Sequence, residues 1–155
     1  QRAYRKILMM IMIDDVVIKQ LRQFSDERGK VMHMLKSTDE IFENFGEVYF
    51  SICNPGFVKA WKMHKQKTSF YCVIDGNAKI VLCDMREGSS TKDNIQEINA
   101  GEDNYVIVKI PAGVAHGFQS IGIKPALLAN LATHPYDPSD NFDIDHVSGN
   151  IKYKW

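Results

Sequence analysis

The stretch at residues 110–118, Ile-Pro-Ala-Gly-Val-Ala-His-Gly-Phe, decides the fold of this chain. Pro111 and Gly113 interrupt an apolar run, and a turn at this point delivers His116 to the start of the next apolar run. Gly117 has no side chain, so another backbone or a ligand can approach the chain closely there. The stretch therefore predicts two strands joined by a turn, with a histidine early in the second strand.

Short apolar runs separated by turn residues continue on both sides of this stretch, at the spacing typical of an all-β sandwich or barrel. The clearest hairpin joins residues 70–74 to residues 78–83 through Asp75-Gly76, a pair that favours a tight turn. No linker rich in Pro, Gly or Ser and no internal repeat divides the sequence. A chain of 155 residues that is 45% hydrophobic can bury one core. We expect a single all-β domain over residues 1–155.

One short helix is also predicted before the main series of strands. Ser37 and Glu40 form a capping-box pair, residues 41–45 carry an apolar stripe, and Gly46 follows as a stop.

The N-terminal segment superficially imitates a signal peptide, because the apolar residues 7–13 follow several basic residues. The run lacks a small-residue cleavage site, is followed by Asp14 and Asp15, and is too short to cross a bilayer. We expect residues 1–13 to be either an extension outside the native fold or an N-terminal edge segment, with no targeting role.

Charge and cysteine content limit the classes of partner. Lys plus Arg and Asp plus Glu both number 19, so the formal net charge is zero and predicts neither nucleic-acid nor membrane binding. Cys53, Cys72 and Cys83 lie in apolar, strand-like runs without Cys-x-x-Cys spacing. This use of cysteine fits small buried side chains in a reducing compartment, and we expect a cytoplasmic protein.

A second histidine, His64, lies in residues 61–67, where large apolar and polar side chains alternate as in a barrel strand. The neighbouring lysines could bind phosphate or lower the pKa of His64 by like-charge repulsion. A histidine beside three lysines also fits a solvated strand face. The residues alone leave both interpretations open.

Several motifs, in one order along the chain, make the sequence similar to the dTDP-4-dehydrorhamnose 3,5-epimerases, a family of cupins. Residues 110–118 contain Pro-x-Gly-x-x-His, the second cupin motif, in a version similar to that of the family. Residues 26–29 resemble its Asp-x-Arg-Gly turn at the phosphate site, and residues 64–66 resemble its His-x-Gln with the catalytic base. The remaining matches, which extend the resemblance from residue 16 to residue 155, are residues 81–91, Tyr136, Pro138 and Trp155.

The resemblance implies a homodimeric jelly-roll barrel that epimerises a nucleotide-linked 4-keto-6-deoxy sugar in the biosynthesis of cell-surface polysaccharide such as lipopolysaccharide. It implies no metal or other cofactor. His64 would be the catalytic base, with His116 and Asp84 supporting the pocket. Arg28 would reach the diphosphate from the other subunit. The residues expected to bind substrate are Arg28, Gln66, Lys67, Lys62, Asn130 and Tyr136.

The implied chemistry follows from the ketone. A carbonyl at C4 acidifies the protons on C3 and C5, so a base within hydrogen-bond reach can remove one and leave an enolate. Donors around the oxygen stabilise the enolate, and reprotonation from the opposite face inverts the carbon.

The proton-transfer machinery departs from the family pattern at two positions. The family's catalytic tyrosine, the acid on the opposite face, aligns with Asn130, and an amide cannot donate and recover a proton as a phenol does. The aspartate that orients the base aligns with Ser148; Asp143 or Asp145 could replace it only if the tail shifts.

Two cationic positions of the pocket have also changed. The family's arginine three residues before the base is Trp61 here, and its pocket lysine falls at Ser69, although Lys67 is near. The resemblance therefore predicts a retained base and barrel, with a changed acid, orienting carboxylate and phosphate site.

Several activities fit these changes. The enzyme could invert one carbon, with water, Lys62, Lys67 or Tyr71 as the proton donor. It could be a sugar-nucleotide ketoisomerase, which needs no acid on the opposite face, or a cupin that binds sugar nucleotides without catalysis. A metal-dependent cupin remains a further alternative. It would normally carry a histidine at Lys62 and a glutamate at Thr68 or Ser69, so its site would be incomplete here.

Overall fold

The computed structural model describes residues 12–155 of the 155-residue chain. The N-terminal segment with two open interpretations, residues 1–13, therefore lies mostly outside the described residues. Ile13 is buried, and its backbone N–H donates to the side-chain oxygen of Gln96 at 3.0 Å. The described chain thus enters the core at Ile13.

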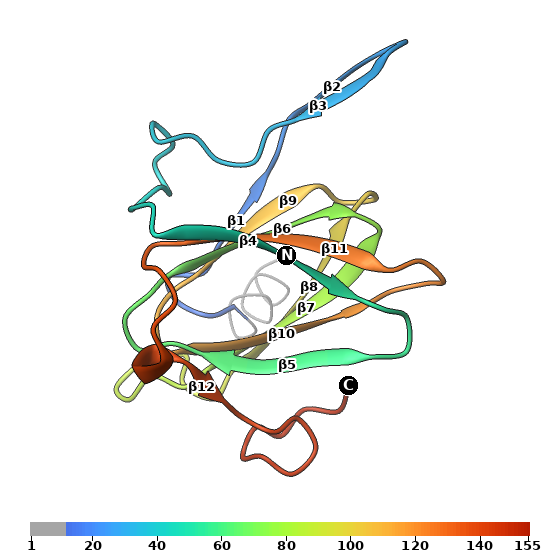
Figure 1. Ribbon diagram of the computed structural model, residues 1–155. Helices are drawn as coiled ribbons and strands as arrows, with labels where there is room; N and C mark the ends of the chain where they lie inside the picture. Colours follow the sequence, from blue (N-terminus) through green and yellow to red (C-terminus); the bar gives the residue numbers. More distant parts are fainter. Residues whose placement is uncertain (1–11) are drawn as a thin grey trace, which may run out of the picture.

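Two antiparallel five-stranded sheets face each other and form the jelly-roll barrel (Figure 1). The first sheet contains, in spatial order, β1 (Val17–Gln20), β9 (Val106–Ile110), β6 (Ser69–Asp75), β11 (Ala126–Ala132) and β4 (Glu47–Cys53). The second contains β12 (Phe142–Asp143), β5 (Val58–Met63), β10 (Val114–Ser120), β7 (Asn77–Asp84) and β8 (Ile95–Gly101). The all-β barrel expected from the sequence is confirmed.

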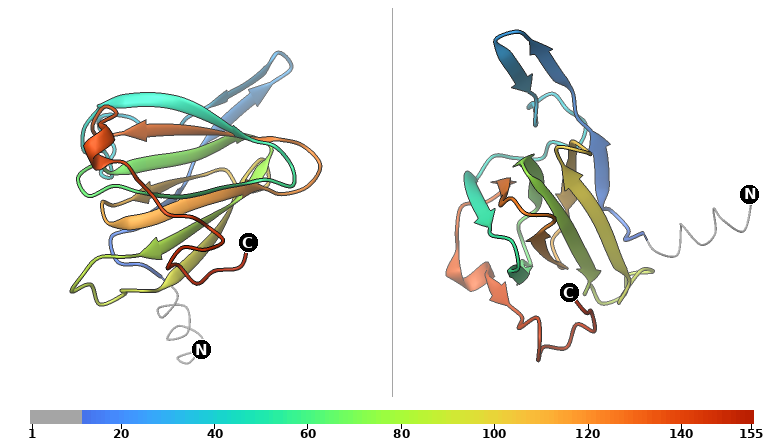
Figure 2. Two further views of the ribbon diagram at one scale, coloured as in Figure 1. Left: turned by 60° about the horizontal axis from the view of Figure 1, so that its bottom comes forward. Right: turned by 90° about the vertical axis from the view of Figure 1, so that its right-hand side faces the viewer.

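Two smaller elements lie outside these sheets. The hairpin of β2 (Gln23–Asp26) and β3 (Gly29–Met32) projects away from the barrel, as Figures 1 and 2 show. A 3-10 helix, η1 (Pro138–Asp140), lies between β11 and β12. Asp137 caps its start by accepting a hydrogen bond from the Ser139 N–H at 2.8 Å, and Pro138 suits the first helical position.

The predicted turns connect strands, but the predicted hairpin is wrong. Gly76, with φ of 72°, makes the tight turn between β6 and β7. This turn carries the chain from the first sheet to the second, so the two strands do not pair with each other. Residues 111–113 connect β9 to β10, and the Gly113 N–H donates to the His64 carbonyl at 2.7 Å. The turn that precedes His116 is therefore bonded directly to the main chain of His64.

The core lies between the two sheets, and a second apolar cluster covers the outer face of the second sheet. Along β7, Ile80 and Leu82 point into the core, whereas Val81 and Cys83 point into the outer cluster. The C-terminal tail covers that cluster, so residues 80–83 of β7 are apolar in succession instead of alternating with polar residues. The outer cluster contains Trp61, Val81, Cys83, Ala115 and Ile151.

The predicted helix near residues 37–46 is wrong. The Asp39 N–H donates to the Lys36 carbonyl and the Phe42 N–H to the Asp39 carbonyl, both at 3.0 Å, so the segment forms two successive turns. The capping carboxylate is Asp39, which accepts from the Lys36 N–H at 2.9 Å and pairs with Lys19 at 3.4 Å. So short a segment needs tertiary packing to stay helical. Here its aromatic Phe45 is 59% exposed.

The cysteines behave as the sequence predicts. Cys53, Cys72 and Cys83 are free and buried. The described part of the chain contains no helix with the length and apolar character needed to cross a bilayer.

Candidate active site

A cavity of about 470 Å³ opens between the two sheets, close to the end of β5. The first sheet contributes side chains from β4 and β6, and the second contributes side chains from β5 and β10. The loop that contains η1 completes the wall. The lining residues are Glu47, Tyr49, Lys62, His64, Lys67, Tyr71, His116, Tyr136 and Asn141. The structure thus brings together His64, His116, Lys62, Lys67 and Tyr136 from the residues that the sequence singled out.

His64 follows β5 directly and is 5% exposed. Its Nδ1 lies 2.6 Å from the backbone carbonyl oxygen of Asp140. A carbonyl can only accept a hydrogen bond, so Nδ1 of the neutral ring carries the proton and Nε2 keeps a free lone pair. The tautomer is the one that a general base needs.

The carboxylate of Asp140 fixes the turn that follows His64. It accepts hydrogen bonds from the backbone N–H groups of Lys65 at 2.6 Å, Gln66 at 3.2 Å and Lys67 at 3.3 Å. Asp140 thus holds the base through its main chain and the next turn through its side chain. Asp140 was not predicted from the sequence; the local clue to it is Asp137-Pro138, a helix-start signal.

The three candidates for an orienting side chain lie elsewhere. In residues 12–155, Asp143 pairs with Lys62, and Asp145 accepts from the backbone N–H of Ser148. The partner of Nδ1 is a main-chain carbonyl, so the interaction depends on backbone position and leaves no side-chain signature in the sequence.

His116 lies beside His64, with 5.6 Å between the ring centroids, and its Nδ1 lies 3.0 Å from the Val114 carbonyl oxygen. Burial lowers the pKa of His116 to about 3. Burial also lowers the pKa of His64; the Asp140 carbonyl opposes this shift, and the charge of Lys67 adds to it. Both rings are therefore neutral at pH 7, and His64 is available to take a proton.

The buried state of His116 predicts a pH-dependent stability. Between its folded pKa of about 3 and the ordinary value of 6.5, the unfolded chain binds a proton that the folded chain does not. The free energy of unfolding should therefore rise with pH in this window, by about 1.4 kcal/mol per pH unit from this group. Urea unfolding of the wild type and of His116→Asn should show a steeper rise for the wild type. Equal slopes would contradict the prediction.

The cations that line the cavity are Lys62 and Lys67, both of which the sequence singled out. His116 on β10 pairs with Lys62 on β5, but Phe118 pairs with Lys59, so one extra residue of β5 forms a bulge opposite Gly117. Trp61 packs in the outer cluster and Lys62 lines the cavity, as alternation with a period of two back from His64 requires. The prediction that a backbone approaches Gly117 is confirmed, because a Cβ atom there would collide with Ala60.

Trp61 therefore belongs to the outer cluster and not to the cavity. Its ring lies 5.1 Å from that of Trp155 and 6.0 Å from that of Tyr153. The second cation, Lys67, is 4% exposed, and its Nζ lies 3.6 Å from Oε1 of Glu47. The ammonium groups of Lys62 and Lys67 are thus the cations of the cavity, and Trp61 occupies the position of the family's arginine.

Asp84, expected to support the pocket, is fully buried at the end of β7 and is not one of the residues that line the cavity. It accepts hydrogen bonds from Arg86 Nε at 2.9 Å, Ser89 Oγ at 2.7 Å and Thr91 Oγ1 at 2.6 Å. Burial raises its pKa, but these bonds outweigh burial and hold the pKa below its usual range. In this structure Asp84 stabilises the loop between β7 and β8.

Arg28 and Gln66 are also not among the residues that line the His64 cavity. Arg28, beside the β2–β3 turn, pairs with Asp26 at 2.6 Å and is exposed, away from the barrel of its own chain. Gln66 lines a neighbouring cavity of about 360 Å³, which shares Tyr136 with the His64 cavity.

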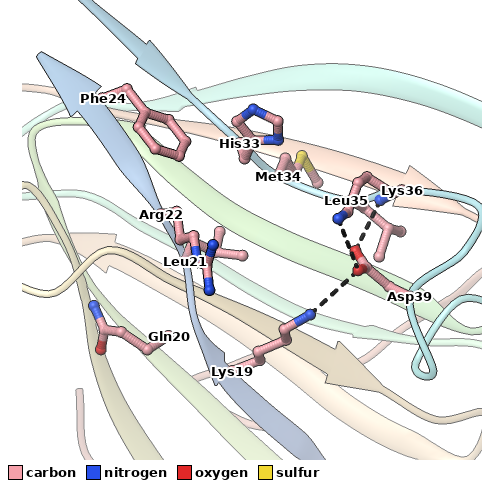
Figure 3. Close-up of a pocket in the computed structure, with 10 residues that line it drawn as sticks. All are labelled: Lys19, Gln20, Leu21, Arg22, Phe24, His33, Met34, Leu35, Lys36 and Asp39. Carbon is pink, nitrogen blue, oxygen red and sulfur yellow. Dashed lines mark hydrogen bonds and ion pairs between the residues drawn. The ribbon is translucent and has the colours of Figure 1, made fainter.

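A further hollow of about 360 Å³ lies between β1, the base of the β2–β3 hairpin and residues 33–39 (Figure 3). Lys19, Arg22 and Lys36 contribute positive charge, and Asp39 pairs with both lysines. In the described structure its lining residues do not overlap those of the His64 cavity.

Asn130 is 1% exposed on β11, and its Nδ2 donates to the phenol oxygen of Tyr49 at 2.7 Å. Tyr49, which lines the cavity, was not singled out from the sequence. The alternation of side chains along residues 47–53 was the signal that could have placed it on the inner face.

The histidines have few companions that could ligate a metal. Within residues 12–155, no group of three or more His, Cys, Asp or Glu side chains has the arrangement of a metal site. The ligand set of a metal-dependent cupin is therefore not formed by these side chains.

Comparison with known proteins identifies relatives over nearly the whole chain. The family model described as dTDP-4-dehydrorhamnose 3,5-epimerase matches residues 10–155. The spore coat polysaccharide biosynthesis protein SpsL of Bacillus subtilis is 35% identical over 93% of this chain and 97% of its own. The probable low-salt glycan biosynthesis epimerase Agl13 of Haloferax volcanii is 33% identical over 83% of each chain.

A solved structure agrees with these relatives. The dTDP sugar isomerase of Desulfovibrio desulfuricans G20 superposes with a TM-score of 0.89, at 35% identity over 92% of each chain. The chain therefore belongs to the dTDP-4-dehydrorhamnose 3,5-epimerase family, a family of isomerases with the cupin jelly-roll fold.

Proposed function

We propose that the protein is a cofactor-independent epimerase that inverts C3, C5 or both in a nucleotide-linked 4-keto-6-deoxy sugar. The observation that carries this proposal is the neutral His64, whose Nδ1 is held by the Asp140 carbonyl and whose Nε2 is free beside a cavity. A base of this kind can remove the proton that the C4 ketone acidifies.

The charges of the cavity support the same reaction. Removal of a proton next to the ketone moves negative charge onto the C4 oxygen, and preorganised positive groups stabilise it. Lys67 is buried, and Lys62 faces the same cavity from β5. We assign Lys67 to the enolate oxygen and the more exposed Lys62 to the diphosphate side, where an ammonium group suits phosphate.

The named relatives support a role in polysaccharide biosynthesis. SpsL and Agl13 carry names that refer to spore coat polysaccharide and to low-salt glycan. The three free, buried cysteines support a reducing compartment, and we place the protein in the cytoplasm.

A homodimer fits the surface of the chain. Phe24 and Val31 on the β2–β3 hairpin are 56% and 61% exposed, and Phe50 on the edge strand β4 is 64% exposed. Burial of such apolar side chains against a second copy would remove them from water and carry Arg28 to the partner's cavity. Light scattering should give the mass of two chains, and a monomer at working concentration would contradict this assignment.

Deuterium wash-in tests the function. The protein is incubated with dTDP-4-keto-6-deoxyglucose in heavy water, in parallel with the UDP sugar, and the label is read at C3 and C5 separately. Label with inversion at both carbons is expected of a 3,5-epimerase, and label at one carbon of a single-site epimerase. A carbonyl moved to C3 would indicate a ketoisomerase. Binding without label would contradict the proposal, and stoichiometric bound metal in elemental analysis would favour a metal-dependent cupin.

A further inference from the structure

One row of polar side chains crosses the first sheet beneath the cavity. In the ladder, Tyr49 of β4 pairs with Asn130 of β11, and Asn130 pairs with Tyr71 of β6. Residues directly opposite each other in antiparallel strands point to the same face. Tyr71 packs edge-on against the ring of His116 at 5.2 Å, so the row faces the interior between the sheets.

The hydrogen bond within this row leaves the proton of Tyr49 free. Asn130 Nδ2 donates to the phenol oxygen of Tyr49, so that oxygen is the acceptor and its own O–H can donate elsewhere. Burial raises the pKa of Tyr49, and the hydrogen bond from Asn130 offsets part of this rise. The phenol therefore keeps its proton at neutral pH, and Asn130 stabilises the phenolate that would remain after proton transfer.

Tyr49 and His64 line the same cavity from different sheets. Tyr49 lies on β4 of the first sheet, and His64 follows β5 of the second, which lies across the barrel (Figure 1). A sugar ring bound between them would present one face to the imidazole and the other to the phenol. Inversion requires this arrangement, because the new proton must arrive on the face opposite to the one that lost it.

The other tyrosines of the cavity are less suited to proton donation. Burial raises the pKa of Tyr71 far above its usual range, and its ring packs between His116 and Phe118. Tyr136 is 63% exposed in the loop before η1. The oxygen of Tyr49 accepts a hydrogen bond from Asn130. Tyr49 is also 42% exposed, so water can reach the phenol and restore its proton.

We propose that Tyr49 is the acid that protonates the enolate on the face opposite to His64, with Asn130 as its positioning residue. The assignment rests on the proposed epimerase function. In the step, the phenol O–H bond breaks and the enolate π pair forms the new C–H bond, while the C4 ketone is restored. The phenolate then accepts from Asn130 Nδ2 until water returns a proton, and the imidazolium of His64 releases its proton to water. Nothing is oxidised or reduced.

Replacing Tyr49 with phenylalanine separates exchange from inversion. In heavy water with dTDP-4-keto-6-deoxyglucose, Tyr49→Phe should still place deuterium in the starting sugar, because His64 can remove a proton and return a deuteron on the same face. Inversion at the labelled carbon should fall about 100- to 10,000-fold, the range for loss of a general acid. Tyr153→Phe, which removes a phenol on the outer face of the second sheet, is the matched control and should invert at the wild-type rate.

Asn130→Ala tests the positioning role. It should slow inversion and leave exchange unchanged, whereas a purely structural defect would lower both. Because Asn130 acts through the phenol, the double variant Tyr49→Phe/Asn130→Ala should invert no more slowly than Tyr49→Phe alone.

The remaining outcomes would overturn the assignment. Wild-type inversion in Tyr49→Phe would do so, as would a loss of inversion in Tyr71→Phe while Tyr49→Phe inverts normally. Loss of both exchange and inversion in Tyr49→Phe would contradict the division of roles between the two faces. Failure of the proposed function gives a different result. The wild type then incorporates no deuterium into either the dTDP sugar or the UDP sugar, so no enolate forms for Tyr49 to protonate.

Discussion

His64→Asn should reduce deuterium exchange at C3 and C5 by about 100- to 10,000-fold, the contribution of a positioned general base. The asparagine side chain can still donate a hydrogen bond to the Asp140 carbonyl, which lies 2.6 Å from Nδ1 in the wild type. It has no basic lone pair to replace Nε2, so the fold is retained while proton removal is lost. Label incorporation under single-turnover conditions, read by mass spectrometry, measures the effect.

The control for this variant is His146→Asn, in the C-terminal tail and outside the cavity lining. It should exchange at the wild-type rate. Binding of dTDP, measured by calorimetry, should be similar in His64→Asn and wild type, since the base acts on the sugar. Full retention of exchange in His64→Asn would remove His64 as the base, whatever happens to the stereochemistry at the labelled carbon.

Asp140→Ala should lower the free energy of unfolding by about 2 to 4 kcal/mol, because buried donors left without an acceptor are costly. The carboxylate accepts from the N–H groups of Lys65, Gln66 and Lys67, and Asp140 itself is 5% exposed. The backbone carbonyl that holds His64 remains, but the turn around it loosens. A displaced base should slow exchange by about 10- to 100-fold. Urea unfolding and wash-in together measure the two effects.

Two further variants make the Asp140 result specific. Asp140→Asn keeps one acceptor oxygen and should give an intermediate loss of stability. Asp145→Ala removes an exposed carboxylate that caps its own turn at Val147 and Ser148, and it should leave exchange unchanged. If Asp140→Ala matched the wild type in both stability and exchange, the carboxylate would have no part in fixing the turn.

The parts of the fold that could be predicted from the sequence depend on short-range signals. Alternating apolar runs, Asp75-Gly76 and the Pro111 turn each determine structure within a few residues. The predicted helix was wrong because its local signals were present while the packing that keeps a short helix folded was not. Local pattern was thus sufficient for strands and turns and insufficient for the helix.

The site depends instead on contacts between distant residues. Asp140 lies 76 positions from His64, and Asn130 lies 81 positions from Tyr49, so neither pair is visible in a local pattern. The bulge in β5 is equally invisible in a local pattern, because it appears only in the pairing, where Phe118 of β10 pairs with Lys59 instead of Ala60. The histidines could be found from their motifs, but the groups that act on them required the three-dimensional register.

The pairing of Tyr49 with Asn130 across two neighbouring strands bears on how this family evolves. The amide and the phenol can exchange places between these two facing positions, and the acidic proton then remains in the same part of the cavity. Chains with tyrosine at the position of Asn130 would need no phenol at the position of Tyr49, so the two positions should covary across relatives. A member with a phenol at neither position would be expected to exchange protons without changing stereochemistry. A search for a catalytic tyrosine at the position of Asn130 alone would classify this chain as lacking the acid. A search that considers the positions of Asn130 and Tyr49 together would find a phenol.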